Sequence, residues 1–266
     1  MNAIIGSHDL LLITLDTLRY DVAQGCFLRG ELPTLQAHLP TAGWELRHTP
    51  ASFTYAAHQA FFAGFLPTPA RPGPHPRRFA LAFSGSETID ANTAVFDTRA
   101  TIVEALADRG YHTICIGGVG FFNRANPLGN ALPALFAEAH WSPELGVTAI
   151  DSTERQVALA CKRLAAPELA QRRCFTFINV SALHQPNHHY LPGAARDDAC
   201  TQAAALRYVD RSLAPLFIAA ARRAPSLVIV CSDHGTAYGE DGYSGHRHAH
   251  SIVMNVPYAE FVLSHE

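Results

Sequence analysis

The chain has 266 residues, of which 48% are hydrophobic and 16% charged, and its formal net charge is -3 at pH 7. This length and composition predict a globular protein in which residues 1–266 form a single domain with a large core. The weak negative charge offers no basic surface, which argues against nucleic acid and anionic membranes as partners.

The N-terminal sequence MNAIIGSHDLLLITLD has no basic segment, and its apolar run ends at Asp16. Such a run is too short for a signal peptide or a membrane span. Six cysteines are scattered without a CxxC pair, a pattern typical of reduced thiols rather than of a zinc finger or a thioredoxin motif. The sequence therefore predicts a cytoplasmic protein without a membrane partner.

Short apolar runs rich in valine, isoleucine and leucine alternate with longer segments of helical period. The apolar runs predict strands buried on both faces, at residues 9–16, 111–118, 174–183, 227–233 and 256–263. The helical segments lie at residues 101–110, 154–166 and 199–223. This alternation predicts an α/β fold with a doubly wound, mostly parallel sheet and helices on both of its faces.

The segment between residues 67 and 98 has a different character. It contains the stretch PTPARPGPHPRR, in which proline recurs too often for a helix or a central strand. We expect a Pro-rich surface loop or flap over one end of the sheet.

Two of the predicted strands end in an acidic residue. Asp16 ends the first strand, and Asp233, followed directly by His234, ends the fourth. One aspartate at such a place is more often a helix cap, but two of them with an adjacent histidine favour a ligand site. In open α/β sheets, ligands bind at the carboxyl ends of the strands. Because carboxylate and imidazole suit zinc or manganese, these three residues are predicted metal ligands.

A third element lies between them, in the stretch HTPASFTYAAHQAFFAGFLP at residues 48–67. Its apolar spacing predicts a helix that opens at or just after Thr54. A hydroxyl at this position is commonly an N-cap. It can also be a nucleophile beside a metal, where the free N–H groups of the helix start stabilise a phosphate or sulfate oxyanion. Both interpretations stay open at this point.

These stretches belong to an ordered set that includes GYHTICIGGVGFFN, FINVSALHQPNHHYLPG and SDHGTAYGEDGYSGHRHAH. The set resembles the alkaline phosphatase superfamily over nearly the whole chain, and its sulfatase-like branch most. The resemblance implies that Asp16, Asp233 and His234 hold a metal. It also implies that Thr54 is the nucleophile and that its oxygen contacts the metal.

Other polar residues of the motifs are also candidates. The resemblance implies that His184 and His246 contact the transferred group or hold a second metal, and Asn179 matches a polar position of the same site. Histidines occupy every second position from His246 to His250, and His250 is a further candidate ligand.

The motifs depart from the sulfatase pattern at several positions. Sulfatases carry a cysteine or serine in a C-x-P-S-R motif that matures to formylglycine, whereas this chain has Thr54 without the proline, and His58 in place of the arginine. Gly118 stands where sulfatases hold sulfate with a lysine, and Val180 stands where two-metal phosphatases have an aspartate. These differences favour the threonine-nucleophile members of the superfamily that use one metal ion.

The sequence thus predicts a metal-dependent hydrolase or transferase that acts on small-molecule phosphate or phosphonate esters, with sulfate esters as a further option. The expected cofactor is a divalent ion, zinc or manganese first, with calcium or magnesium as alternatives. The competing hypothesis is an inactive sulfatase-like scaffold that binds metal or a phosphorylated ligand. A serine hydrolase based on Ser52 or Ser232 is disfavoured, because neither serine lies in a G-x-S-x-G motif.

Overall fold

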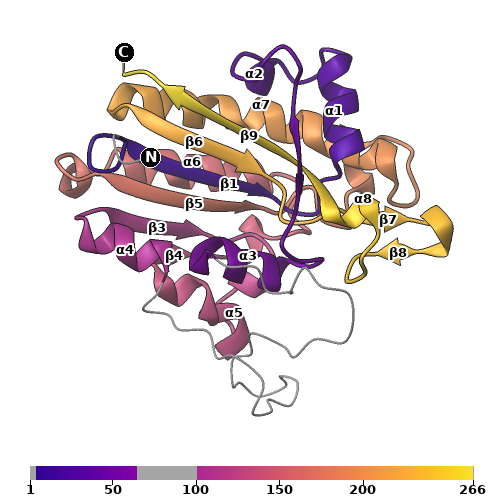
Figure 1. Cartoon of the computed structure of the whole chain (residues 1–266), viewed down its shortest axis with the longest axis horizontal. Helices are drawn as coiled ribbons and strands as arrows, with labels where there is room; N and C mark the ends of the chain where they lie inside the picture. The colour runs from indigo at the N-terminus through magenta and orange to yellow at the C-terminus, as the bar shows by residue number, and fades with distance from the viewer. Residues whose placement is uncertain (1–3, 65–100, 266) are drawn as a thin grey trace.

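The computed structural model describes residues 4–64 and 101–265. The predicted Pro-rich flap at 67–98 lies outside these residues. The described part is built on a seven-stranded sheet with the strand order β2-β9-β6-β1-β5-β3-β4, and a separate two-stranded sheet pairs β7 with β8 (Figure 1).

The element bounds are as follows. The strands are β1 (Asp9–Leu15), β2 (Glu45–His48), β3 (His112–Ile116), β4 (Glu138–His140), β5 (Cys174–Val180), β6 (Ser226–Cys231), β7 (Ala237–Tyr238), β8 (Ser244–Gly245) and β9 (Asn255–Leu263). The α-helices are α1 (Tyr20–Leu28), α2 (Pro33–Gln36), α3 (Thr54–Ala63), α4 (Ile102–Asp108), α5 (Pro127–Ala131), α6 (Ser152–Leu164), α7 (Ala199–Arg223) and α8 (Ser251–Met254).

All five predicted strands are present, and the mixed, mostly parallel sheet confirms the predicted fold class. Strands β1, β3, β4, β5 and β6 run parallel, whereas β9 pairs antiparallel with β6 and β2 antiparallel with β9. An apolar run does not encode strand direction, so a wholly parallel sheet could not be distinguished from this one. Two strands were not predicted: β2, whose residues ELRH are all exposed, and β4, which has only three residues.

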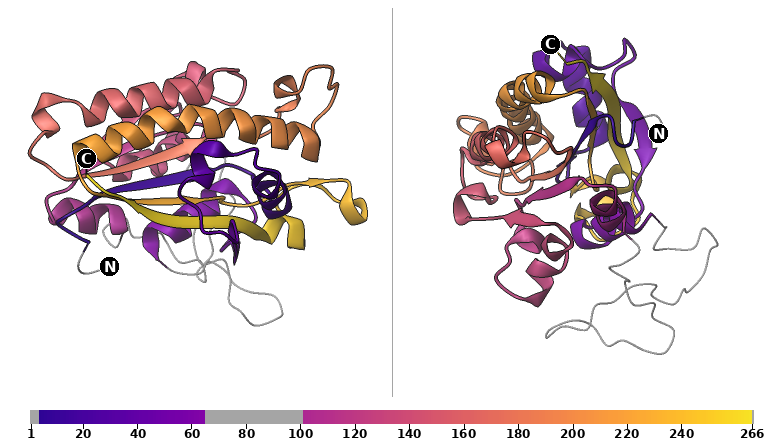
Figure 2. Two further views of the ribbon diagram at one scale, coloured as in Figure 1. Left: turned by 90° about the horizontal axis from the view of Figure 1, so that it is seen from above. Right: turned by 90° about the vertical axis from the view of Figure 1, so that its left-hand side faces the viewer.

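The two faces of the sheet follow from the alternation of side chains along each strand. On β1, Leu11 and Ile13 belong to the cluster that packs against α1, α6 and α7. Leu10 and Leu12 point the other way, toward the cluster that includes Phe62 of α3 and residues of α4. Helices therefore cover both faces, as predicted, with α6 and α7 side by side on one of them (Figures 1 and 2).

Among residues 4–64 and 101–265, the covering of the sheet by helices is incomplete near β6 and β9. A groove of about 450 Å³ crosses this part of the sheet and is lined mostly by apolar side chains such as Leu12, Ile229 and Tyr258. The strand β9 has exposed and half-buried positions along most of its length. The prediction that all five strands are buried on both faces is therefore wrong for β9, whereas the residues of β6 are buried or half-buried. Among the described helices, α3 and α4 lie over β3, β5 and β1 instead of β9.

The predicted helices are confirmed with small shifts of their ends. Helix α6 begins two residues earlier than the predicted 154, and α7 has the predicted bounds. At the start of α7, the Asp198 side chain and Thr201 form a capping box. Helix α1 was not predicted from the sequence. Across residues 4–64 and 101–265, no helix combines the length and the apolar character that a membrane crossing requires.

Candidate metal centre

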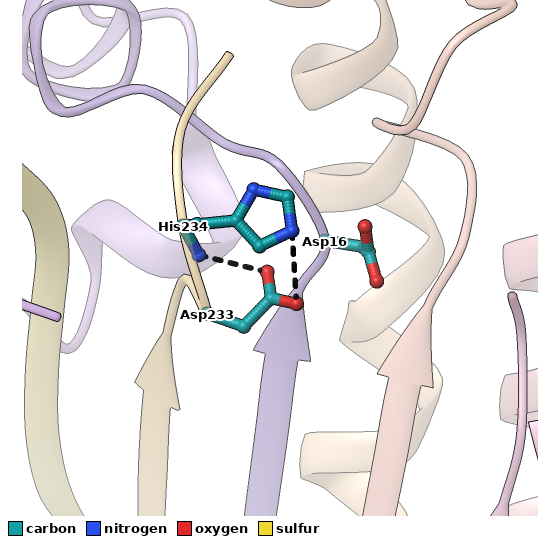
Figure 3. A group of neighbouring side chains, drawn as sticks. All are labelled: Asp16, Asp233 and His234. Carbon is teal, nitrogen blue, oxygen red and sulfur yellow. Dashed lines mark hydrogen bonds and ion pairs between the residues drawn. The ribbon is translucent and has the colours of Figure 1, made fainter. Parts of the chain in front are cut away.

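The pairing of β1 with β6 places two aspartates side by side. In this parallel register Thr14 lies opposite Cys231, so Asp16 and Asp233, each two residues further on, emerge at the same edge of the sheet. Both side chains are fully buried, as is His234. One ligand atom from each of the three residues lies within 4.8 Å of the others, and the three side chains converge above the strand ends (Figure 3).

A backbone hydrogen bond fixes the orientation of His234. Its Nδ1 lies 2.8 Å from the carbonyl oxygen of Gly235, which can only accept, so Nδ1 carries the proton. Burial lowers the pKa of His234, so the ring is neutral and its Nε2 lone pair faces the site, 3.5 Å from Asp233 Oδ2. Metal-binding histidines are held in this way, with the other ring nitrogen donating to a carbonyl or carboxylate.

Only one oxygen of the Asp233 carboxylate, Oδ1, accepts hydrogen bonds from the described residues. The backbone N–H groups of Thr17 and His234 donate to its Oδ1, at 3.2 and 3.0 Å. Thr17 adopts a left-handed conformation with φ of 64°, which is strained for a β-branched residue and directs its N–H toward the aspartate. The strained backbone of Thr17 allows its N–H group to donate to the buried Asp233 carboxylate.

The carboxylate oxygens that accept no hydrogen bond show whether a cation fits the site. Asp233 Oδ2 and Asp16 Oδ1 are buried acceptors without a hydrogen-bond partner among the described residues. An unsatisfied buried carboxylate oxygen is costly unless it is paired or coordinates a metal. Two such oxygens beside the Nε2 lone pair of His234 form a donor set that suits one divalent ion.

Burial raises the pKa of both carboxyl groups. Burial, followed by the charge of Asp233, raises the pKa of Asp16 to about 6. Burial raises the pKa of Asp233 to about 7, against the opposing effect of its backbone hydrogen bonds. Both groups therefore retain protons at mildly acidic pH, and an ion must displace these protons to bind.

We expect the affinity for a divalent ion to fall steeply as the pH is lowered from 8 to 5. Below pKa values of about 6 and about 7 for Asp16 and Asp233, up to two protons are released per ion bound. The affinity should then fall by up to about 100-fold per pH unit. Calorimetric titration in buffers of different ionisation enthalpy counts the protons, and an affinity that is constant over this range would contradict the carboxylate ligands.

Thr54 is the first residue of α3, as predicted, but it is not an N-cap. Phe53 occupies the cap position, and the helix start has no side-chain cap hydrogen bond. Instead, Thr54 Oγ1 lies 3.2 Å from His234 Nε2 and 3.5 Å from Asp16 Oδ2. The structure thus places the hydroxyl beside the candidate metal ligands, with the N–H groups of the first helical turn next to it.

Two further predicted histidines reach this region. The His246 ring lies 4.6 Å from the His234 ring and 6.0 Å from the His184 ring, measured between centroids. Burial, with His234 and His184 nearby, lowers the pKa of His246 to about 3. His184 is partly buried, and its Nδ1 lies 2.6 Å from the carbonyl oxygen of Gln185.

The candidate ligand His250 is directed elsewhere. Its Nε2 pairs with Asp241 Oδ2 at 3.0 Å, and its Nδ1 accepts the backbone N–H of Ile252 at the start of α8. His248 stacks on Tyr243 and bonds the carbonyl oxygen of Gly245. Within the described residues, His248 and His250 do not join His246 in a group of possible metal ligands, because this segment turns rather than continuing as a strand.

Asn179 lies behind the metal ligands rather than among them. Its Nδ2 donates to Asp16 Oδ2 at 2.9 Å and lies 3.3 Å from Thr14 Oγ1. The sequence analysis did not assign roles to Thr14, Thr17 or His58, which surround the site. For His58 a signal was available, since it follows Thr54 by four residues and so lies on the same helix face.

Gly118 marks a place where the chain has no room for a side chain. A Cβ built there would lie 2.3 Å from the carbonyl oxygen of Asn179 and 2.8 Å from Ser181 Cβ. A lysine that holds sulfate therefore cannot be restored at this position by a simple substitution. The departure from the sulfatase pattern therefore follows from the close contact of the Gly118 backbone with Asn179 and Ser181.

The fold and site together define a class of protein. A mostly parallel sheet of this kind also forms the core of a protein in the alkaline phosphatase superfamily from Vibrio parahaemolyticus, which is 16% identical to this chain with a TM-score of 0.57. Within that class, the chain belongs to the sulfatase family, whose family model matches residues 8–258. A search among curated proteins finds no match to the sequence.

Solved structures support this assignment at the level of the fold. The C-terminal periplasmic domain of phosphoethanolamine transferase EptC from Campylobacter jejuni is 13% identical, with a TM-score of 0.63 over 96% of this chain and 80% of that domain. The zinc complex of the corresponding Escherichia coli domain is 10% identical, with a TM-score of 0.61 over 97% of this chain and 74% of that domain.

The lipoteichoic acid synthase LtaP from Listeria monocytogenes is a third similar structure. It is 12% identical to this chain, with a TM-score of 0.61, and the match covers 97% of this chain and 65% of LtaP. The chain thus spans slightly less than two thirds of LtaP.

Proposed function

We propose that the chain is a metal-dependent hydrolase or transferase of phosphate or phosphonate esters, with Thr54 as its nucleophile. The observation that carries this proposal is the position of Thr54 Oγ1, which is turned away from the helix cap and toward His234 Nε2 and Asp16 Oδ2. A scaffold that only binds a ligand has no need of a buried hydroxyl beside its metal ligands.

The geometry supports the following division of roles. A divalent ion held by Asp16, Asp233 and His234 would act as a Lewis acid, lowering the pKa of the Thr54 hydroxyl and neutralising phosphoryl oxygens. Thr54 Oγ1 attacks phosphorus, and the free N–H groups at the start of α3 bind the non-bridging oxygens. The leaving oxygen departs with a proton, and the phosphothreonine is released by water in a hydrolase or by an alcohol in a transferase.

We assign the proton transfer to His184 rather than to His246. Burial lowers the pKa of His246 to about 3, so this ring is neutral at pH 7 and acts as a hydrogen-bond acceptor or as a donor from one nitrogen. The His184 Nδ1 lies 2.6 Å from the Gln185 carbonyl oxygen, so Nε2 is the nitrogen that would serve the leaving group.

Phosphorus esters are favoured over sulfate esters for two reasons. Formylglycine cannot be made from Thr54, and the position of Gly118 excludes the lysine that holds sulfate in sulfatases. The similar structures include a phosphoethanolamine transferase and a lipoteichoic acid synthase. We therefore propose a small-molecule phosphate or phosphonate ester as the substrate, without nucleic acid or membrane as a partner.

The first test is the metal content of protein purified without chelators or a histidine tag. We expect about one equivalent of zinc or manganese per chain, and hydrolysis of bis(4-nitrophenyl) phosphate or a phenylphosphonate ester that is lost on chelation and restored by the ion. Metal binding without turnover of any ester would favour the inactive scaffold. A chain that takes up no ion would contradict the metal-dependent enzyme and would leave an inactive scaffold that binds a phosphorylated ligand.

We also propose that the protein works in a reducing compartment, the cytoplasm. Its six cysteines are unpaired, and four of them are buried. The two EptC structures are periplasmic domains, and that location belongs to those proteins. Fractionation of the source cells, with thiol alkylation of the native protein, tests this proposal.

A further inference from the structure

His58 lies in an unusual place for an imidazole. It follows Thr54 by one helical turn, its side chain is fully buried, and its ring packs among four phenylalanines, namely Phe61, Phe62, Phe122 and Phe177. An apolar side chain would fill such a cage without the cost of burying two polar nitrogens. The hydrogen bonds of the ring show what the imidazole adds.

Each ring nitrogen of His58 has one defined partner. Nδ1 lies 2.7 Å from the carbonyl oxygen of Thr54, which can only accept, so Nδ1 carries the proton. The buried ring is neutral, which leaves Nε2 as an acceptor. Thr14 Oγ1, at 3.0 Å, must therefore donate to it. The direction of both hydrogen bonds is thus determined by the chemistry of the groups.

The hydrogen bonds continue from helix α3 to the strands β1 and β5. Asn179 Nδ2 has two hydrogens, one for Thr14 Oγ1 at 3.3 Å and one for Asp16 Oδ2 at 2.9 Å. The backbone N–H of Val119 donates to Asn179 Oδ1 at 3.0 Å, which fixes the amide in this orientation. Thr14 and Asn179 lie opposite each other in the parallel pairing of β1 with β5.

We propose that His58 is a positioning residue that, through Thr14 and Asn179, holds the reactive hydroxyl of Thr54 in register with Asp16. This inference rests on the proposed function above. Apolar packing alone does not prevent α3 from sliding or rotating on the sheet by a fraction of an ångström. A directed chain of hydrogen bonds does, and His58 Nδ1 also lies 3.8 Å from Asp233 Oδ2. Errors of about 1 Å in such geometry cost on the order of 100-fold in rate.

The first pair of variants removes one link without altering the shape of the core. Thr14→Val lacks the hydroxyl, and Thr14→Ser keeps it and serves as the matched control. We expect Thr14→Val to lower kcat for bis(4-nitrophenyl) phosphate, or the affinity for Mn²⁺, by about 10–100-fold. KM should stay within about twofold because the substrate's own contacts remain. Thr14→Ser should recover most of the loss.

A second pair tests whether the links act together. His58→Asn places an amide N–H near Nδ1 but has no group at Nε2, whereas His58→Phe fits the aromatic cage and removes both nitrogens. If the chain acts as a unit, His58→Asn combined with Thr14→Val should be no worse than the more damaging single variant. Losses that simply multiply would show that the two residues act independently and would overturn the proposal.

A third measurement does not depend on activity. Nitrogen-15 NMR of the histidine rings reports the tautomer, and the structure requires His58 to be neutral with its proton on Nδ1. A proton on Nε2 would overturn the chain of donors. Normal turnover and metal affinity in Thr14→Val would overturn the positioning role alone. A wild-type chain without metal binding or turnover would overturn the proposed function and the positioning role with it.

Discussion

Replacing Thr54 with alanine is expected to reduce turnover of a phosphate diester by about a thousandfold or more while the chain keeps its metal ion. The hydroxyl is the only part of this side chain that lies within reach of His234 Nε2 and Asp16 Oδ2. Asp16, Asp233 and His234 remain to bind the ion. Alanine is accepted at the first position of a helix, and no cap is lost because the hydroxyl forms none.

The control for this prediction is Thr54→Ser, which keeps a hydroxyl and should retain measurable turnover. Metal content by elemental analysis and turnover by product release are measured on the same preparations. Full activity in Thr54→Ala would exclude Thr54 as the nucleophile. Loss of the ion together with activity would show instead that the hydroxyl is a structural ligand.

The second large effect is expected for Asp233→Asn, which should lose metal binding and turnover and yet stabilise the metal-free fold at pH 8. Burial raises the pKa of Asp233 to about 7, so the folded state holds its proton more tightly than the unfolded chain does. The stability of the metal-free protein therefore falls as the pH rises from about 4 to about 7, and the loss is complete above that range.

Asparagine removes this cost and suits the existing contacts. Its Oδ1 can accept the N–H groups of Thr17 and His234, as the aspartate does now. Its Nδ2 would replace the unpartnered Oδ2 and face the Nε2 lone pair of His234, which lies 3.5 Å away. We expect a gain on the order of 1–3 kcal/mol in the free energy of unfolding at pH 8, vanishing near pH 4.

Chemical denaturation of the chelator-treated proteins at pH 8 and pH 5 measures this effect. Asp108→Asn, at an exposed position at the end of α4, is the matched control and should change neither stability nor metal binding. A metal-free Asp233→Asn chain that is less stable than the wild type at pH 8 would show that the carboxylate is stabilised by a partner other than an ion. Unchanged metal content in this variant would remove Asp233 from the site.

The positions of the main strands could be predicted from local sequence, whereas their directions depend on contacts between distant segments. The apolar runs predicted the five strands, because a strand covered by helices must be hydrophobic over its length. They did not reveal that β9 runs antiparallel to β6, since direction depends on the connection and not on the run. The short strands β2 and β4 had too few residues to form a pattern.

In the candidate site, too, some residues could be identified from local sequence and others only from the folded structure. Asp16, Asp233 and His234 could be found from the sequence because each follows the end of an apolar strand, where ligands bind in α/β sheets. Thr54 could be placed at a helix start, but the position of its Oγ1 was needed to show that the hydroxyl does not cap the helix. His250 alternates with His246 in the sequence, and only the turn of the chain showed that its nitrogens are used elsewhere.

By itself the sequence determined the main strands, the main helices and the candidate ligand residues, because these depend on periodicity and on the few residues that follow each strand. The tertiary structure alone decided that Asp16 and Asp233, far apart along the chain, stand side by side, because β1 pairs with β6 in one register. It also decided the hydrogen-bond partners of His58. The sequence shows only that His58 shares a helix face with Thr54, whereas its contact with Thr14, and through Thr14 with Asn179, is made between segments that only folding brings together.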